Sequence, residues 1–298
     1  MYFTRTALSV GFAAVLPFVV MAHTHEGKVV VESTQVTENI YMITGQGGNI
    51  GLAVDEKYTL MIDDQFATLS DQIKSVIQEI SDKQIAYLLN THYHFDHTDG
   101  NANFSDHVGV IVAHDNVRQI LKSGTTIEPF GREIGPYADA ALPALTFNDK
   151  LTIHQAGEEV KLVHFASAHT GGDTVVFFED SNVIHAGDLH FSGFYPFIDT
   201  GGGGSVEGYI AAQEAILAMI DEETKIIPGH GPLSTKADMA RDLAMLRNVV
   251  ALVETALAKG EGLEQLLQNK VIQAYDASHG DGFLNTETFL TILLNALK

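Results

Sequence analysis

The sequence predicts a single large α/β domain, and three observations support this. The chain has 298 residues, 45% of them hydrophobic and 18% charged, which is a globular composition with enough apolar material for a core. Short strand-like runs alternate with segments of helical periodicity. No repeat, low-complexity tract or linker divides the chain. We therefore expect one domain over residues 23–298, with a helical C-terminal part over about residues 235–298.

Residues 1–22 are predicted to be a cleavable signal peptide. Arg5 precedes an apolar run that ends at Val20, and small residues at the end of the segment suit cleavage after Ala22. The run is shorter than the roughly 20 residues that span a membrane. An uncleaved membrane anchor is the alternative, and Pro17 within the run disfavours it. We expect a periplasmic or secreted protein that is free of the membrane after cleavage.

The composition limits the partners and the ligand types. There are 17 Lys and Arg against 38 Asp and Glu, a net charge of −21, which becomes −22 when Arg5 is removed with the signal peptide. A field of this sign repels phosphate backbones and anionic lipids, so we expect a small-molecule substrate and no nucleic-acid partner. Cysteine is absent, which excludes disulfides and leaves His, Asp and Glu as metal ligands. Nothing in the sequence indicates the oligomeric state.

The first half of the domain is predicted to be mainly strands. Strand-like runs occur at KVVVES, NIYMITG, NIGLAVDE and YTLMIDD, the last ending in two carboxylates. Apolar residues from Ile73 to Ile80 then recur at helical spacing. Thr68 and Asp71 match a capping box ahead of this helix. QIAYLLN returns to a strand that leads directly into a histidine-rich motif.

The second half repeats the alternation and ends in helices. EVKLVHFA, DTVVFFE and NVIHAGD are predicted strands, a helix is predicted over Val206–Met219, and another strand at TKIIPGHG. An apolar stripe from Leu243 to Leu257 predicts a packed helix. Two long irregular stretches, Gly124–Thr146 and Phe191–Ser205, are candidate functional loops.

The motif LLNTHYHFDHTDGN, residues 88–101, is the strongest functional signal. Four of its side chains can bind a metal: His92, His94, Asp96 and His97. If the strand continues through His92 and His94, these two project from the same side, and the other two reach a second point. Two metals in a shared site lie about 3.5–4 Å apart, so the spacing suits two ions. The alternative, a solvated histidine-rich loop, is disfavoured because the motif ends an apolar strand.

Three further polar residues occur at predicted strand ends in the second half. They are His169 in SAHTGGDT, Asp188 in HAGD and His230 in PGHGP. Each is unremarkable alone, but together they supply the missing ligands of a two-metal site. The neighbouring glycines let the backbone approach the ions closely. His185 and His190 flank Asp188, and we expect them to be structural.

Taken in order along the chain, these residues resemble the metallo-β-lactamase superfamily over residues 29–230. The residues that carry the resemblance are Asp63, His92, His94, Asp96, His97, His169, Asp188 and His230. The resemblance implies an αββα sandwich with C-terminal helices and a site at one edge, between two sheets. It also implies a hydrolase that uses two divalent metal ions, of which Zn²⁺ fits these ligands best.

The same resemblance divides the ligands into two groups. The first ion would be held by His92, His94 and His169. The second would be held by Asp96, His97 and His230. Asp188 would bridge both ions, and Asp63 would orient a ligand histidine. A water shared by the ions would become a hydroxide near neutral pH and attack a carbonyl, with Asp96 orienting it or accepting its proton.

The ligand pattern also allows other members of the superfamily and one different class of protein. His94 stands where the flavodiiron oxygen reductases have Glu, which favours hydrolysis. The single-iron persulfide dioxygenases share much of the ligand pattern and stay a minor alternative. A non-catalytic metal-binding protein is the alternative of another class, and a complete two-metal set disfavours it.

A β-lactam is the best substrate guess, with a lactone, ester or thioester as the alternative. Export would bring the enzyme to β-lactams, and four aromatic residues after Asp188 are candidates for a substrate wall: Phe191, Phe194, Tyr195 and Phe197. Against this, cysteine-bearing β-lactamases have Cys and Lys where this chain has Asp188 and Phe191. Lactonases have Tyr at the position of Phe191, and the acidic C-terminal helices show no basic residues for glutathione. Asp199 and Ser205 are weaker candidates for shaping the substrate entrance.

Overall fold

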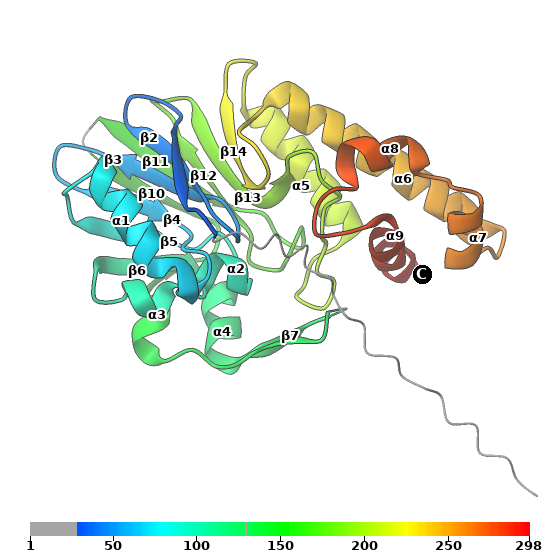
Figure 1. The fold of residues 1–298 in the computed structure, drawn as a ribbon, viewed down its shortest axis with the longest axis horizontal. Helices are drawn as coiled ribbons and strands as arrows, with labels where there is room; N and C mark the ends of the chain where they lie inside the picture. The colour runs from blue at the N-terminus through cyan, green and yellow to red at the C-terminus, as the bar shows by residue number, and fades with distance from the viewer. Residues whose placement is uncertain (1–28, 129, 156) are drawn as a thin grey trace, which may run out of the picture.

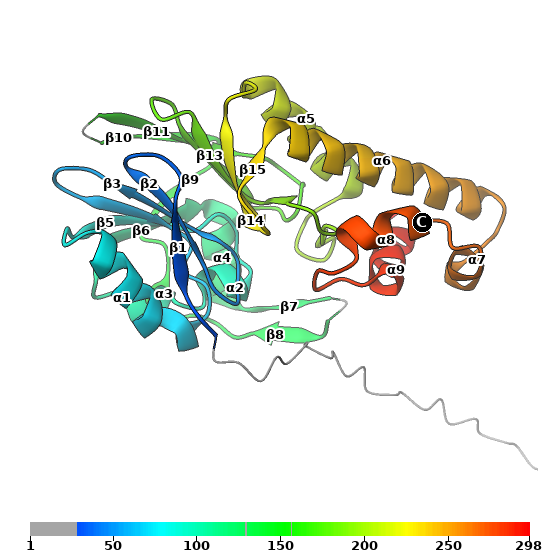
Figure 2. The same cartoon turned by 45° about the horizontal axis from the view of Figure 1, so that its top comes forward.

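The computed structural model describes residues 29–128, 130–155 and 157–298; the predicted signal peptide, residues 1–22, lies outside them. Two β-sheets pack face to face, and helices cover the outer face of each, which confirms the expected αββα sandwich (Figure 1). Turned by 45°, the molecule shows the C-terminal helices extending from one side (Figure 2). None of the described helices is long and apolar enough to cross a membrane.

The first sheet has seven strands and is mixed. Its first four strands form an antiparallel meander, and the pairs from β4 onward are parallel. In spatial order the strands are β1 (Glu32–Gln35), β2 (Ile40–Thr44), β3 (Ile50–Val54), β4 (Thr59–Ile62), β5 (Ile85–Leu89), β6 (Val108–His114) and β9 (Leu145–Phe147). β4, β5 and β6 therefore end at the same edge of the sheet.

Helix α1 (Ser70–Ile80) covers the outer face of this sheet. Its buried residues Ile73 and Ile77 pack in a cluster with strand residues such as Leu88. The predicted capping box is wrong, because the N-cap is Leu69 and no side chain caps the helix. The reason is that the short 3-10 helix η1 (Ala67–Leu69) takes up the predicted cap position. The other helices of this half are α2 (Phe95–Thr98), α3 (Asn101–Phe104) and α4 (Asp115–Ser123).

The second sheet has six strands in sequence order. Its pairs are antiparallel except β13 with β14, which are parallel. The strands are β10 (Lys150–Gln155), β11 (Glu158–His164), β12 (Thr174–Phe178), β13 (Val183–Phe191), β14 (Lys225–His230) and β15 (Ser234–Thr235). The crossover from β13 to β14 contains α5 (Val206–Met219), which has the predicted bounds and is capped by Ser205.

Helices α5 and α6 (Lys236–Ala258) lie along the outer face of the second sheet (Figure 2). The predicted apolar stripe of α6 faces inward, with Leu243, Leu246 and Val253 buried. Thr235 and Asp238 form a capping box at its start. The remaining helices are α7 (Leu263–Gln268), α8 (Gln273–His279) and α9 (Thr286–Ala296).

The two stretches expected to be irregular differ from each other. The first, Gly124–Thr146, is partly regular: it contains a hairpin of β7 (Thr125–Ile127) and β8 (Arg132–Ile134), and the 3-10 helix η2 (Asp139–Ala141). The second has no helix or strand between Phe191 and α5, as predicted. The hairpin matters because it forms one side of the pocket described below.

Candidate metal centre

The seven predicted metal ligands lie together at one edge of the sandwich. Four follow β5, His169 lies in the loop between β11 and β12, Asp188 belongs to β13, and His230 ends β14. The strand does not continue through His92 and His94: β5 ends at Leu89, and His94 is the N-cap of α2. Beyond the end of β5, Thr91 donates its backbone N–H to Asp63 Oδ1 over 2.7 Å.

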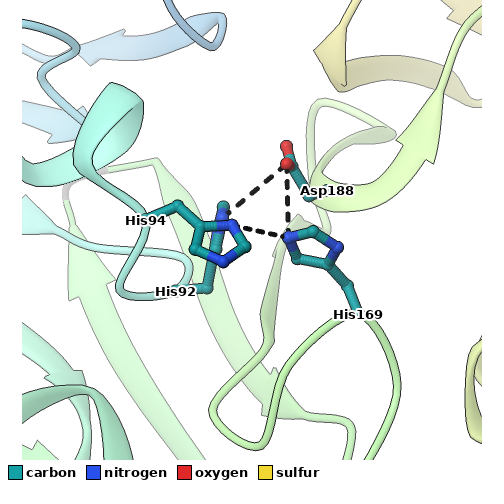
Figure 3. Close-up of side chains that lie close together, drawn as sticks. All are labelled: His92, His94, His169 and Asp188. Carbon is teal, nitrogen blue, oxygen red and sulfur yellow. Dashed lines mark hydrogen bonds and ion pairs between the residues drawn. The ribbon is translucent and has the colours of Figure 1, made fainter. Parts of the chain in front are cut away.

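The first group of ligands comes from three separate segments (Figure 3). One donor atom from each of His92, His94, His169 and Asp188 lies within 4.8 Å of every other. The Asp188 Oδ2 atom is 3.7 Å from His92 Nε2 and 3.4 Å from His169 Nε2. The His169 Nε2 atom is 3.0 Å from His94 Nδ1. Three imidazole nitrogens and one carboxylate oxygen thus converge on one point, a donor set suited to zinc and similar metals.

The second group faces the other oxygen of Asp188. Its members are Asp96, His97 and His230. The Asp188 Oδ1 atom is 3.1 Å from His97 Nε2 and 3.4 Å from His230 Nε2. Asp96 Oδ2 is 3.2 Å from His230 Nε2. Each carboxylate oxygen of Asp188 therefore serves one group of histidines, which is the arrangement of a bridging ligand.

Two buried atoms show that these residues fit metal ions. His92 Nε2 is shielded from solvent and makes no hydrogen bond with the described residues, and Asp188 Oδ1, also shielded, has only ion-pair contacts with His97 and His230. A buried polar atom without a partner is costly, and coordination to a cation would satisfy both atoms. Glycines make room: a Cβ on Gly229 would lie 2.0 Å from Asp188 Oδ1, and one on Gly48 would lie 2.1 Å from the His97 ring.

Backbone and side-chain partners orient the ligand rings. His97 Nδ1 is 2.8 Å from Asp63 Oδ2, so the histidine donates to the carboxylate and turns Nε2 toward the site. Asp63 itself has a φ of 60°, and Thr91 binds it through its N–H and its hydroxyl. His169 Nδ1 donates to the Phe197 carbonyl over 2.8 Å. These contacts fix the tautomers of the His97 and His169 rings.

The orientation of His94 depends on Asp199. His94 Nε2 lies 2.9 Å from Asp199 Oδ2, which leaves Nδ1 to face the first group. Tyr93 donates its hydroxyl to the same oxygen. Burial and the Asp199 carboxylate raise the pKa of Tyr93, so the hydroxyl keeps its proton. The sequence suggested Asp199 only as a residue at the substrate entrance; the structure places it behind a ligand.

Burial keeps two histidines of the first group neutral. It lowers the pKa of His169 to about 4. Burial, with the nearby charge of His97, also holds the pKa of His92 well below its usual range. Both rings therefore present a free lone pair near neutral pH, which is the form that binds a metal.

The carboxylates at the second group are charged. Burial alone would raise the pKa of Asp96, but His97 and His230 outweigh burial and lower it to about 2. For Asp188, too, the histidines, His97 foremost, outweigh burial and hold the pKa well below its usual range. In return, Asp188 and Asp96 outweigh the effect of burial on His230 and raise its pKa to about 9. A metal ion at this group would therefore displace the proton from His230 and be held by the ionised carboxylates.

The sequence model of the metallo-beta-lactamase superfamily matches residues 43–231, which include Asp63 and all seven ligands. The chain belongs to this superfamily. A protein described as the hydroxyacylglutathione hydrolase GloC of Haemophilus influenzae is 29% identical over 189 residues, covering 61% of this chain and 84% of that protein.

Solved metallo-β-lactamases have the same fold. The DIM-1 metallo-beta-lactamase superimposes with a TM-score of 0.60 at 17% identity, covering 74% of this chain and 100% of that one. A metallo-beta-lactamase from Pontibacter korlensis gives a TM-score of 0.59 at 14% identity, covering 73% of this chain and 99% of that one. At these identities the similarity establishes the fold of the superfamily and leaves the substrate open.

In this superfamily member, a pocket of about 450 Å³ opens onto the metal ligands. Its lining is mostly apolar, with five phenylalanines. Besides His94, Asp96, Asp188 and His230, the lining residues are Gln46, Phe66, Phe95, Ile127, Phe130, Arg132, Phe197 and Phe283. A pocket of this size and character suits a small organic molecule.

The prediction of a substrate wall is right for one residue of four. Phe197 lines the pocket, and the other three predicted aromatic residues do not. Phe191 is buried and stacks on the His230 ring at 5.2 Å, where it supports a ligand. Tyr195 is in the core, stacked on Phe289 at 4.5 Å. Phe194 points toward Gly231 and Gly282.

The other lining residues carry no local sequence signal and come from separate segments of the chain. Phe130 comes from the β7–β8 hairpin and Phe283 from the loop between α8 and α9, and the two rings lie 6.2 Å apart. Phe283 is 55% exposed, an unusual position for a large apolar side chain. His185 and His190, by contrast, are structural as expected: they contact the Asn49 carbonyl and the Ser234 hydroxyl.

Proposed function

We propose that this protein is a two-metal hydrolase, with zinc as the metal, that cleaves the acyl bond of an ester or thioester. The observation that carries the proposal is Asp188, whose two oxygens face two histidine groups at the floor of an apolar pocket. Two such cations, when bound, supply Lewis-acid polarisation of a carbonyl and lower the pKa of water.

The chain itself supplies positioning and proton transfer. Asp96 is partly exposed and lines the pocket, and its carboxylate is ionised because His97 and His230 outweigh burial and lower its pKa to about 2. The ionised Oδ2 can accept a hydrogen bond from water and so orient it. The rings of Phe130, Phe197 and Phe283 meet across the pocket at centroid separations of 5.0–6.4 Å. They exclude bulk water and contact the apolar part of a substrate.

An ester or thioester is favoured over a β-lactam by sequence similarity and by two residues that differ from those of cysteine-bearing β-lactamases. GloC, the relative at 29% identity, is named for hydrolysing hydroxyacylglutathione, a thioester. Asp188 and Phe191 replace the Cys and Lys of cysteine-bearing β-lactamases. The C-terminal helical region contributes Phe283 to the pocket and no basic residue, so a carboxylate of the thiol would have to be bound by another part of the lining. A β-lactam is the second candidate, supported by the predicted export.

An activity panel with metal analysis tests the proposal. It comprises an aromatic ester, a thioester, a homoserine lactone, a chromogenic cephalosporin and a phosphodiester. We expect ester or thioester turnover, about two metal ions per chain, and loss of turnover after chelation that added zinc restores. Rapid cephalosporin turnover alone would replace the acyl assignment with the β-lactam one. Bound metal without turnover of any substrate would favour a non-catalytic metal-binding protein.

A further inference from the structure

The pocket contains one side chain that the hydrolytic site does not use. Arg132, on strand β8, is the only lysine or arginine among the described residues that line the pocket. The other charged residues of the lining, Asp96 and Asp188, are engaged with histidines. Arg132 is itself exposed, so its charge costs little to keep hydrated until a ligand arrives.

Arg132 is held in place by the ligand segment itself. Its guanidinium lies over the ring of Phe95, 4.6 Å from the centroid. Phe95 is the residue between the ligands His94 and Asp96, so the cation is positioned relative to the metal centre. A contact of the guanidinium with a ring face uses none of its N–H groups as donors to an oxygen, so they can still donate to a ligand. Among the described residues, no carboxylate lies within ion-pair distance of it.

The net negative charge of the chain makes a local cation important for binding an anionic substrate. At a net charge of −21, the molecule repels a free anion at long range. An anionic substrate therefore needs a local cation in addition to the metal centre, whereas a neutral substrate does not. Phe66, 5.7 Å from Phe95, continues the apolar surface beside the cation. The pocket thus offers an apolar wall with a single positive point.

We propose that Arg132 binds a carboxylate of the substrate while the scissile acyl group lies at the metal ligands. The substrate class is then an ester or thioester with an apolar body and one free carboxylate, which a guanidinium edge can bind in a bidentate manner. This inference rests on the proposed function, because it assigns the second anchor of the same substrate. Arg132 is a specificity-determining residue.

The test compares two matched substrates on four proteins. One substrate is an aromatic ester with a free terminal carboxylate, and the other has a carboxamide in its place. The proteins are the wild type, Arg132→Gln, Arg132→Lys and the control Lys122→Gln. Lys122 is an exposed cation at the end of α4 that lies outside the pocket, so its loss changes the net charge equally.

We expect Arg132→Gln to raise KM for the carboxylate substrate by about 10- to 100-fold, with kcat changed much less. KM for the carboxamide should stay the same. Arg132→Lys should recover part of the loss, and Lys122→Gln should match the wild type. An equal loss on both substrates would overturn the inference, because Arg132 would then only pack the hairpin against Phe95. An unchanged KM would overturn it as well.

A binding experiment separates this inference from the proposed function. Phenylacetate and phenylacetamide are titrated into the metal-loaded wild type and Arg132→Gln by calorimetry. We expect phenylacetate to bind the variant more weakly and phenylacetamide to bind both proteins equally. If no acyl substrate is hydrolysed, the proposed function fails while this titration still decides the role of Arg132. Equal phenylacetate affinity in both proteins would refute that role.

Discussion

His94 Nε2 lies 2.9 Å from the Oδ2 of Asp199, a residue 105 positions later in the chain. The contact directs His94 Nδ1 toward the other ligands of the first group, since the two ring nitrogens point in different directions. A carboxylate behind a ligand histidine fixes its tautomer and raises its basicity. Asp199 is therefore a positioning residue for the metal centre.

Replacement of Asp199 by Ala should weaken metal binding by about 10- to 100-fold, the usual effect of removing such an outer partner. Competition with a chromogenic chelator measures the affinity. Tyr93→Phe is the matched control, because it removes the other hydrogen bond to the same oxygen and leaves the contact with His94. An Asp199→Ala protein with the metal affinity of the wild type would contradict this role.

The bridging position of Asp188 predicts different metal contents for two carboxylate variants. Asp188→Ala removes an oxygen from both groups and should lose both ions, whereas Asp96→Asn changes only the second group and should retain one. Turnover should fall by more than about 100-fold in each variant. This loss is larger than the usual effect of removing a residue that only orients a metal ligand. Elemental analysis and circular dichroism give the metal content and the fold. Two ions retained in Asp188→Ala would rule out a bridge.

Gly229 should not tolerate a side chain. A Cβ there would lie 2.0 Å from Asp188 Oδ1, so Gly229→Ala must displace the carboxylate or the strand. Overpacking of this kind costs about 1–3 kcal/mol, and we expect metal loss with it. Gly135→Ala is the control, since a Cβ at Gly135 meets nothing within 4 Å. Thermal denaturation and metal analysis of both variants test this, and a fully loaded, active Gly229→Ala would contradict it.

The buried carboxyl group of Asp173 should make the free energy of unfolding depend on pH. Burial raises its pKa to about 7, against hydrogen bonds from Thr170 that lower it. The folded protein therefore holds a proton that the unfolded chain releases near pH 4, so this residue destabilises the fold progressively as the pH rises from about 4 to about 7.

Asn at this position does not titrate, and Asp173→Asn should remove that penalty. The difference in free energy of unfolding between Asp173→Asn and the wild type should be roughly 2 to 3 kcal/mol larger at pH 8 than at pH 5, in favour of the variant. Urea denaturation of both proteins at the two pH values measures the difference, in which contributions from other groups cancel. A difference that is the same at both pH values would show that Asp173 does not titrate in this range.

Much of the architecture could be predicted from local sequence. Apolar runs such as VVFF and II correspond to the buried strands β12 and β14, because a strand buried on both faces needs a continuous apolar run. The bounds of α5 agree with the prediction, and Ser205, a candidate for the substrate entrance, instead caps this helix. The donor types of the metal centre were also evident, since only His, Asp and Glu were available.

The metal-binding side chains and most of the strands can be predicted from the sequence, since both depend on residue type and short spacing. How they meet follows from contacts made only in the folded chain. Thr91 binds Asp63 beyond the end of β5, and Tyr195 turns away from the pocket to stack on Phe289. Arg132 reaches the site because the hairpin lays it on Phe95. These contacts join segments distant in the chain, and their formation depends on the packing of the two sheets, which no local pattern encodes.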